Sequence, residues 1–231
     1  MPNKLKIGVI LSGSGVYDGS EIHESVLTLL AIDKEGAQAV CYAPNIMQHH
    51  VINHLDGSEM REERNVLVES ARIARGEIKS LDSFSVDDID ALVLPGGFGA
   101  AKNLSKWAFA GHKGEINQET KNAIVSTFKS NKPIGAMCMG PTVVAKALED
   151  LKLDEKLTVG TVNSPSPYDI TEISNGMNSL GANAQMAEVY EAVVDKENKI
   201  VSSPCYMMEA SIAMINEGIE KCIKEVVSLA F

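Results

Sequence analysis

The sequence predicts an α/β protein with a mostly parallel sheet and helices on both faces. Short apolar runs alternate with segments of helical periodicity along the 231 residues. These runs are continuously apolar, which is typical of strands covered on both faces. With 45% hydrophobic and 23% charged residues, the composition is that of an ordinary globular protein. Because we find no internal repeat, low-complexity tract or flexible linker, we expect a single domain over residues 1–231.

The first half of the chain supplies three predicted strands and two predicted helices. Residues 7–11 form an apolar run that predicts a buried strand and is too short for a signal-peptide core or a membrane span. Helical spacing follows over residues 21–35 and ends at Gly36, a residue suited to a helix C-terminus. The next predicted elements are a strand at 39–43, an irregular insertion at 47–57, a charged amphipathic helix at 59–75 and a strand at 89–94 followed by a turn at 95–99.

The second half continues the alternation and ends in a long helix. Residues 132–137 predict a strand, and the helix at 141–148 begins with a proline, which its first turn accommodates because the missing N–H has no partner there. The remaining predicted elements are helices at 119–130, 171–180 and 207–229, a strand at 157–161, and strands at 189–195 and 200–203 around a hairpin-like turn.

Charge and cysteine content exclude several classes of partner. Lys and Arg number 21 against 31 Asp and Glu, a net charge of −10. So acidic a chain repels phosphate groups, and we expect neither nucleic acid nor an anionic membrane as a partner. The cysteines show no CxxC pair and no zinc spacing, so we expect reduced thiols and no metal. Because no leader is evident before the first strand, we expect a cytoplasmic protein. The four cysteines are Cys41, Cys138, Cys205 and Cys222.

One cysteine lies in a segment typical of a nucleophile. Residues 132–141 run from a strand through a tight turn into a helix, and Gly135, Ala136 and Gly140 are the small residues that such a turn needs. Cys138, at the apex, would point above the carboxyl ends of the strands, where open α/β sheets bind ligands. The dipole of the following helix would also favour a thiolate. The alternative is a small buried hydrophobic residue, the role we assign to the other three cysteines.

Two glycine-rich loops follow other strands. In residues 95–103 the glycines would let backbone N–H groups approach a ligand closely, as an oxyanion hole requires, although an ordinary turn explains the loop equally well. Residues 13–19 have the spacing GxGxxxG instead of GxGxxG, and the strand at 39–43 is not followed by a ribose-binding acid. We therefore expect the second loop to shape a pocket rim rather than to bind a nucleotide.

Together these features resemble the ThiJ/PfpI superfamily, which is related to class I glutamine amidotransferases. More closely, the chain is similar to the ElbB branch, described as isoprenoid-biosynthesis glyoxalase or enhancing lycopene biosynthesis protein. The resemblance covers essentially the whole chain and implies a flavodoxin-like three-layer sandwich and a homodimer. The segments that carry it are 11–24, 51–55, 95–105 and 198–206.

The resemblance also implies the residues of the site. The family's nucleophile falls on Cys138, and its helix-one acid falls on Glu24, twelve residues before Gly36. Gly97 and Met139 would supply backbone N–H groups to an oxyanion. A carboxyl group protonated by burial can donate a hydrogen bond to a thiolate and then move a proton. The alternative for Glu24 is a solvated acid stabilised by the helix dipole.

Four further residues are weaker candidates for the pocket. The turn at 95–103 contributes Gly96, Lys102 and Asn103. Lys102 could favour a thiolate or meet an anionic product, but it is as readily a surface lysine. His23 could assist catalysis, as could His112, although packing or capping within the first helix is the simpler role for His23.

The expected catalytic histidine is missing from the sequence. Many superfamily members have a histidine after the nucleophile or on the loop after the next strand, whereas the histidines here are His23, His49, His50, His54 and His112, none of which follows Cys138. Amide hydrolysis needs a base that also protonates the leaving amine, so we do not expect glutaminase or peptidase activity. A loop containing His49, His50 and His54 lacks a complete metal-ligand set.

The sequence thus predicts glyoxalase-type chemistry on a small aldehyde. Adding a thiolate to an aldehyde is less demanding than amide hydrolysis because no amine leaves. We expect Cys138 to add to a 2-oxoaldehyde such as methylglyoxal, Glu24 to move a proton, and hydrolysis to release a 2-hydroxy acid without glutathione, metal or another cofactor. The alternative is a non-catalytic sensor or regulator in which Cys138 responds to oxidants or carbonyl compounds.

Overall fold

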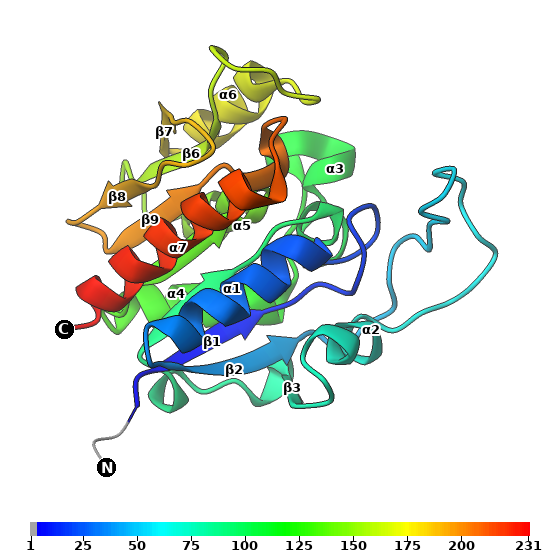
Figure 1. Cartoon of the computed structure of the whole chain (residues 1–231), viewed down its shortest axis with the longest axis horizontal. Helices are drawn as coiled ribbons and strands as arrows, with labels where there is room; N and C mark the ends of the chain where they lie inside the picture. Colours follow the sequence, from blue (N-terminus) through cyan, green and yellow to red (C-terminus); the bar gives the residue numbers. More distant parts are fainter. Residues whose placement is uncertain (1–3) are drawn as a thin grey trace.

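A seven-stranded, mostly parallel sheet forms the centre of the computed structural model, which describes residues 4–231 (Figure 1). Its strand order is β3-β2-β1-β4-β5-β9-β8, and every pair is parallel except β8 with β9. We predicted the absence of a leader partly from residues 1–3, and these residues lie outside the described part of the chain. The strands are β1 (Lys6–Ile10), β2 (Gln38–Ala43), β3 (Ile78–Ser80), β4 (Ala91–Leu94), β5 (Ile134–Met137), β8 (Val193–Asp195) and β9 (Ile200–Ser203).

Helices cover both faces of this sheet, as predicted for a flavodoxin-like sandwich. Helices α1 and α7 lie side by side across one face, with α4 and α5 behind the sheet (Figure 1). A smaller pair, β6 (Lys156–Gly160) and β7 (Asn183–Met186), lies beside α6. The helices are α1 (Ile22–Lys34), α2 (Val66–Ile73), α3 (Trp107–Ala110), α4 (Gln118–Lys129), α5 (Gly140–Leu148), α6 (Ile170–Leu180) and α7 (Ile212–Leu229).

The central strands place the site at one edge of the sheet. Strands β1, β4 and β5 are buried almost throughout, which explains their continuous apolar sequences. The chain runs from β1 through β2 to β3 on one side and from β4 to β5 on the other. The order therefore reverses between β1 and β4, and such a reversal opens a crevice at the carboxyl ends of the strands.

Two predicted helices begin later than the sequence suggested. We predicted a helix over 59–75, but α2 begins after Asn65, whose Oδ1 accepts a hydrogen bond from the Val68 amide. Residues 59–65 instead belong to the irregular insertion that projects from the body in Figure 1. The terminal helix, predicted from residue 207, begins after Ser211, which caps it. In both cases the capping side chain outweighs the apolar spacing before it.

Several short elements, among them two strands and a π-helical turn, were missed because their sequences have no strong period. Strands β3 and β7 have three and four residues and are only partly buried, so their pairing depends on neighbouring strands. A π-helical turn, Ala100–Leu104, follows the glycine-rich loop after β4. No helix within residues 4–231 is long and apolar enough to cross a membrane.

Candidate functional site

Cys138 occupies the predicted tight turn between β5 and α5. Its backbone has φ 55°, in the left-handed region that a residue with a side chain rarely adopts. The amide of Cys138 donates a hydrogen bond to the Ser203 carbonyl at 3.0 Å, which ties the turn to the end of β9. Strain at a buried turn above the sheet is typical of a functional residue.

Glu24 lies beside Cys138 and is completely buried. Its carboxylate oxygens accept hydrogen bonds from the Gly96 amide at 3.0 Å and the Tyr206 amide at 3.1 Å, and the carboxyl group also bonds to Cys138. These contacts bring α1, the loop after β4 and the loop after β9 to one point. The predicted partnership of Glu24 with Cys138 is therefore present in the geometry, whereas a solvated helix acid is not.

Glycine is required at position 96 because the two side chains meet there. A Cβ atom on Gly96 would lie 2.2 Å from Cys138 Cβ and 2.6 Å from Glu24 Oε2. No side chain fits at those distances without moving one of the two. Gly96 thus contacts both reactive groups, and its absent side chain makes their approach possible.

Burial keeps Glu24 protonated at neutral pH. Desolvation and the charge of Glu21 raise the pKa of Glu24 to about 8, against the opposing hydrogen bonds from Tyr206, Cys138 and Gly96. Glu21 caps α1, where its Oε2 accepts a hydrogen bond from the Glu24 amide at 2.7 Å. At pH 7 the Glu24 carboxyl can therefore donate a hydrogen bond, and it can release its proton at mildly alkaline pH.

The prediction of a thiolate favoured by the helix dipole is wrong. Burial raises the pKa of Cys138 well above its ordinary value, and the negative charge of ionised Glu24 raises it further. Hydrogen bonds from the Gly97 and Met139 amides oppose this shift without overcoming it. These two amides are the predicted oxyanion donors, and both are directed at the sulfur. The resting group is a thiol that becomes a thiolate only when its proton is removed.

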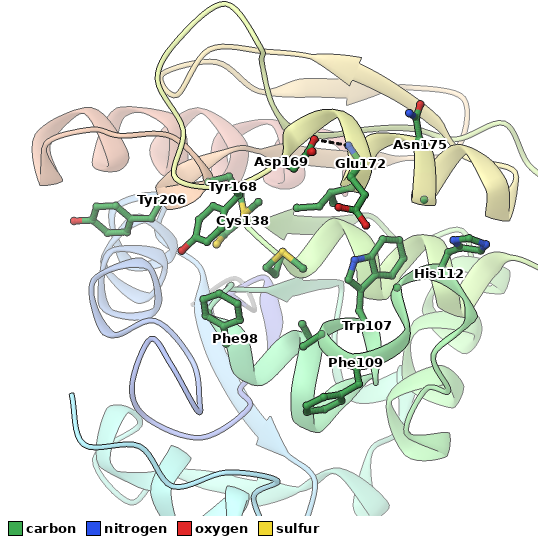
Figure 2. Close-up of a pocket in the computed structure, with 18 of the residues that line it drawn as sticks. Phe98, Trp107, Phe109, His112, Cys138, Tyr168, Asp169, Glu172, Asn175 and Tyr206 are labelled. Carbon is green, nitrogen blue, oxygen red and sulfur yellow. Dashed lines mark hydrogen bonds between the residues drawn. The ribbon is translucent and has the colours of Figure 1, made fainter. Parts of the chain in front are cut away.

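A large cavity opens in front of Cys138. Its volume is about 770 Å³, and its walls come from the glycine-rich loops, α3, α6 and the loop before α6. Figure 2 shows Phe98 and Tyr168 next to Cys138, whereas His112 lies on the far side of Trp107. The cavity thus reaches Cys138, but its one lining histidine is not beside the sulfur.

The weaker pocket candidates do not line this cavity. Asn103 is buried and donates to the Ser12 and Asp18 carbonyls, both at 2.9 Å, so it holds the first glycine-rich loop in place. The Lys102 ammonium donates to the Tyr17 carbonyl at 2.7 Å and makes no contact with Cys138. Their assignment to the pocket was wrong because both side chains point back into the loops.

His23 bonds to a residue outside its own helix. Its Nδ1 lies 2.9 Å from the hydroxyl of Tyr206, which lines the cavity, while His23 itself sits on the exposed side of α1. It neither caps the helix nor reaches the sulfur. The loop at 13–19 does shape the rim as predicted: Val16 lines the cavity and its carbonyl accepts the Phe98 amide at 2.8 Å.

Sequence reasoning missed the aromatic and acidic walls. Trp107, Tyr168 and Glu172 line the cavity, yet none lies next to a motif. The one signal available was that Trp107 is the single tryptophan of the chain. Their approach to Cys138 depends on how α3, α6 and the preceding loop fold over the end of the sheet.

The other cysteines behave as buried structural residues. All four cysteines are free. Burial raises the pKa of Cys41 to about 11 and that of Cys222 to about 12. Within residues 4–231, no cluster of three or more His, Cys, Asp or Glu side chains could hold a metal ion. Cys138 is therefore distinguished by the cavity and by Glu24, not by a low pKa.

Comparison with known proteins agrees with this architecture. No family model matches the chain. The chain is 40% identical over 228 residues to the human glutamine amidotransferase-like class 1 domain-containing protein 3, mitochondrial, covering 97% of this chain and 83% of the relative. The chain belongs to the family of glutamine amidotransferase-like class 1 domain proteins. It is also 30% identical to the ES1 protein, mitochondrial, of Danio rerio, covering 96% of this chain and 85% of that protein.

Solved structures of similar proteins have the same fold. An isoprenoid biosynthesis protein with an amidotransferase-like domain from Ehrlichia chaffeensis superposes with a TM-score of 0.87 and 35% identity, covering 97% of this chain and 99% of the other. Drosophila melanogaster DJ-1beta, at 18% identity, has a TM-score of 0.52, covering 99% of this chain and 96% of the other. The flavodoxin-like fold predicted from the sequence is confirmed.

Proposed function

We propose that this protein converts a 2-oxoaldehyde into a 2-hydroxy acid without glutathione. The observation that carries the proposal is the buried Glu24 carboxyl, which bonds to Cys138 at the head of the cavity and has a pKa of about 8. A general acid and base works best when its pKa lies near the working pH. Glu24 meets that condition and touches the nucleophile.

The reaction begins with proton transfer from sulfur. The ionised fraction of Glu24, about a tenth of molecules at pH 7, takes the Cys138 proton as the sulfur bonds to the aldehyde carbon. Glu24 returns that proton to the former carbonyl oxygen, giving a hemithioacetal. The Gly97 and Met139 amides, which point at the sulfur, lie close to the developing oxyanion and stabilise it.

Isomerisation and hydrolysis complete the cycle. Glu24, again ionised, removes the proton from the first carbon of the adduct and delivers it to the second. The hydroxyl proton on the first carbon passes to the oxygen on the second carbon, so that the adduct becomes the thioester of a 2-hydroxy acid. Water then cleaves the C–S bond, the acid leaves, and the sulfur regains its proton. The sum is one 2-oxoaldehyde plus one water giving one 2-hydroxy acid.

Tyr168 supplies a neutral hydrogen-bond donor to this reaction. It lies beside Cys138 (Figure 2), and burial together with the charges of Cys138 and Glu24 raises the pKa of its hydroxyl to about 12. The phenol stays protonated throughout the working range and donates to the second carbonyl oxygen. It does not replace the base of a glutaminase, because it cannot take up a proton and pass it to a leaving amine.

Lactate formation from methylglyoxal tests the proposal. We expect wild type to produce lactate, and Cys138→Ser and Glu24→Gln to lose at least ~100-fold in kcat, the effect usual for removing a general acid–base group. Cys41→Ala, in a strand away from the cavity, is the matched thiol control and should retain activity. Equal rates in wild type and both site variants would refute the assignment.

A non-catalytic sensor is the second candidate. The absence of a histidine beside Cys138 favours it, since sensing requires no proton shuttle. Oxidation follows thiolate character and exposure, however, and Cys138 is a buried thiol with a raised pKa. Formation of a stable sulfenic acid at low hydrogen peroxide, with no lactate from any 2-oxoaldehyde, would favour the sensor over the enzyme.

Branch, assembly and location belong to the same proposal. Placement in the ElbB branch is supported by the likeness to the Ehrlichia isoprenoid biosynthesis protein. We propose a homodimer, which light scattering of the purified protein tests. We also propose a cytoplasmic location, whereas the curated relatives are named mitochondrial; fractionation of the source cells decides between the two.

A further inference from the structure

The cavity is much larger than methylglyoxal requires. Its volume of about 770 Å³ is in the range of pockets that enclose drug-sized ligands, roughly 300–1,000 Å³. A three-carbon aldehyde bound to Cys138 fills only the end of it. The rest of the cavity must hold either water or the body of a larger substrate.

Several aromatic side chains contribute to the walls of that remaining space. Phe98, Trp107, Phe109 and Tyr168 all line it, and Figure 2 shows the first two rings on either side of the hollow in front of Cys138. The rings of Phe98 and Tyr168 meet edge to face with centroids 5.8 Å apart. Such walls favour a flat or apolar group, because aromatic side chains gain from burying one and lose little conformational freedom.

Trp107 is held as a fixed wall. A Cβ on Gly176 would lie 2.8 Å from its Cζ2 atom, so α6 packs directly on the indole, and the side chain is 8% exposed. Because neither the helix nor the ring can move without losing this contact, the width of the cavity is set by the fold. The space is therefore built into the fold and does not depend on a mobile side chain.

The charges on the walls are negative. Glu21, Asp169 and Glu172 line the cavity, while no Lys or Arg among the described residues 4–231 does. Glu172 points from the first turn of α6 toward Trp107 in Figure 2. Carboxylates beside aromatic faces repel anions and attract cations.

Two lysines near the phenylalanine rings do not reverse this potential. The ammonium of Lys102 lies 5.4 Å from the ring centroid of Phe98, and that of Lys106 lies 5.8 Å from that of Phe109. Both are hydrogen-bonded to backbone carbonyls, of Tyr17 and Lys102 respectively. Neither lines the cavity, so a bound ligand meets the carboxylates first.

We infer that the substrate is a carbonyl compound with an aryl-sized apolar body and no negative charge. Its carbonyl carbon meets Cys138, its body lies between Phe98 and Trp107, and a positive charge at its far end is favoured by Glu172. For the reactive end of the substrate, this inference rests on the proposed function. For the rest of the substrate, it rests on the volume and the lining of the cavity.

A kinetic series tests the inference. With the wild-type protein, kcat/KM is measured for methylglyoxal, phenylglyoxal and phenylglyoxals bearing a para carboxylate or a para trimethylammonium group. We expect phenylglyoxal to exceed methylglyoxal at least ~10-fold, in line with burying an aromatic ring. We also expect the carboxylate to fall at least ~10-fold below phenylglyoxal and the cation to match or exceed it. Methylglyoxal as the best substrate, or the carboxylate as the best aryl compound, overturns the inference.

Binding to a catalytically dead variant separates this inference from the proposed function. In Cys138→Ser the single tryptophan, Trp107, reports occupancy of the cavity by fluorescence. We expect acetophenone and its para-trimethylammonium derivative to quench it saturably, and acetone and 4-acetylbenzoate not to; N-acetyltryptophanamide corrects for absorption by the ligands. If wild type turns over no aldehyde but the aryl ligands bind, the proposed function fails and the ligand class stands. If turnover occurs but the aryl ligands neither bind nor react preferentially, the proposed function stands and the inferred ligand class fails.

A charge variant tests the role of Glu172. In Glu172→Gln, the preference for the cationic over the carboxylate aryl ligand should shrink at least ~3-fold, the effect of one exposed charge. Glu63→Gln, on the exposed insertion, is the matched control and should leave the preference unchanged. An unchanged preference in Glu172→Gln would remove this residue from the recognition of charge.

Discussion

At the scale of residues, the Glu24 carboxyl and the Cys138 thiol are two buried acids in one site, and the charge of one raises the pKa of the other. Glu24 ionises first because its pKa is about 8, while that of Cys138 lies well above its ordinary value. Once ionised, Glu24 opposes ionisation of the sulfur. The pair therefore holds one negative charge at moderately alkaline pH, and that charge can move between oxygen and sulfur.

Removing the carboxyl should make the thiol more acidic and the enzyme inactive. In Glu24→Gln the repulsion from a negative neighbour is gone, while an amide can still donate a hydrogen bond to sulfur. We expect the pH midpoint of Cys138 alkylation by iodoacetamide to fall relative to wild type, with turnover lost. A midpoint that stays the same or rises would mean that Glu24 does not repel the thiolate; Glu63→Gln serves as the control.

Tyr168→Phe should lower the rate without changing the pH profile. The phenol has a pKa of about 12, so it remains a neutral donor wherever Glu24 titrates. Losing one donor to a developing charge costs about 100- to 1,000-fold in kcat. A plot of kcat against pH should still change near pH 8, where Glu24 titrates. A shift of this change to another pH would show that Tyr168 acts on Glu24 rather than on the substrate.

At the scale of elements, the loop after β4 brings the acid to the nucleophile. Gly96 lets α1 and the elbow after β5 approach each other, and the Glu21 amide donates to the Gly96 carbonyl at 3.0 Å. Three segments that are distant in sequence are thus fixed by one short turn. Enlarging that turn affects all three.

Gly96→Ala should separate Glu24 from Cys138. The added methyl group would lie 2.2 Å from Cys138 Cβ, so one or both side chains must move. We expect a loss of roughly 1–3 kcal/mol in the free energy of unfolding, as is usual for overpacking, and a far larger loss of activity. Gly57→Ala adds an atom with nothing within 4 Å, but its φ of 76° disfavours alanine, so it controls for activity and not for stability; its activity should remain intact. Wild-type activity in Gly96→Ala would contradict the geometry.

The elements differ in how far sequence alone predicts them. The buried central strands and the elbow at Cys138 were predictable because apolar runs and small turn residues act locally. Strands β3 and β7 were not, since their pairing is decided by neighbours far along the chain. The start of α2 was misplaced because the cap at Asn65 outweighs the charged periodicity before it. Elements defined by a local rule were predicted, and those defined by tertiary contact were missed.

The site follows the same division. Cys138 and Gly96 belong to turns whose chemistry is visible in the sequence, and the resemblance added Glu24, Gly97 and Met139. Tyr168 and Trp107 reach the cavity through loop and helix packing that no spacing reveals. The raised pKa of Cys138 was missed because it arises from burial, whereas the sequence showed only the favourable helix dipole.

For the whole molecule, the buried acid links stability to pH. Glu24 has a pKa of about 8 in the folded protein, against 4.5 for an ordinary glutamate. A pKa raised by folding means that the associated stability is fully present below pH 4.5 and is lost as the pH rises through 8. Over those 3.5 units the loss is at most about 5 kcal/mol. Glu155, whose pKa burial also raises, acts in the same direction.

Urea unfolding from pH 5 to pH 9 should therefore show falling stability in wild type and a flatter dependence in Glu24→Gln. Asp56, Asp150, Asp195 and Glu220, whose pKa values are lowered, lose their contributions only at more acidic pH, outside this window. His49, whose pKa is lowered by burial, and Glu155 are present in both proteins, so they cancel in the difference. The stability difference between the two proteins should then grow steadily from pH 5 and level off near pH 8, the pKa of Glu24. If the free energy of unfolding depended on pH in the same way in both proteins, Glu24 would not be protonated in the folded protein at neutral pH. The proton transfer between the two substrate carbons would then need another base.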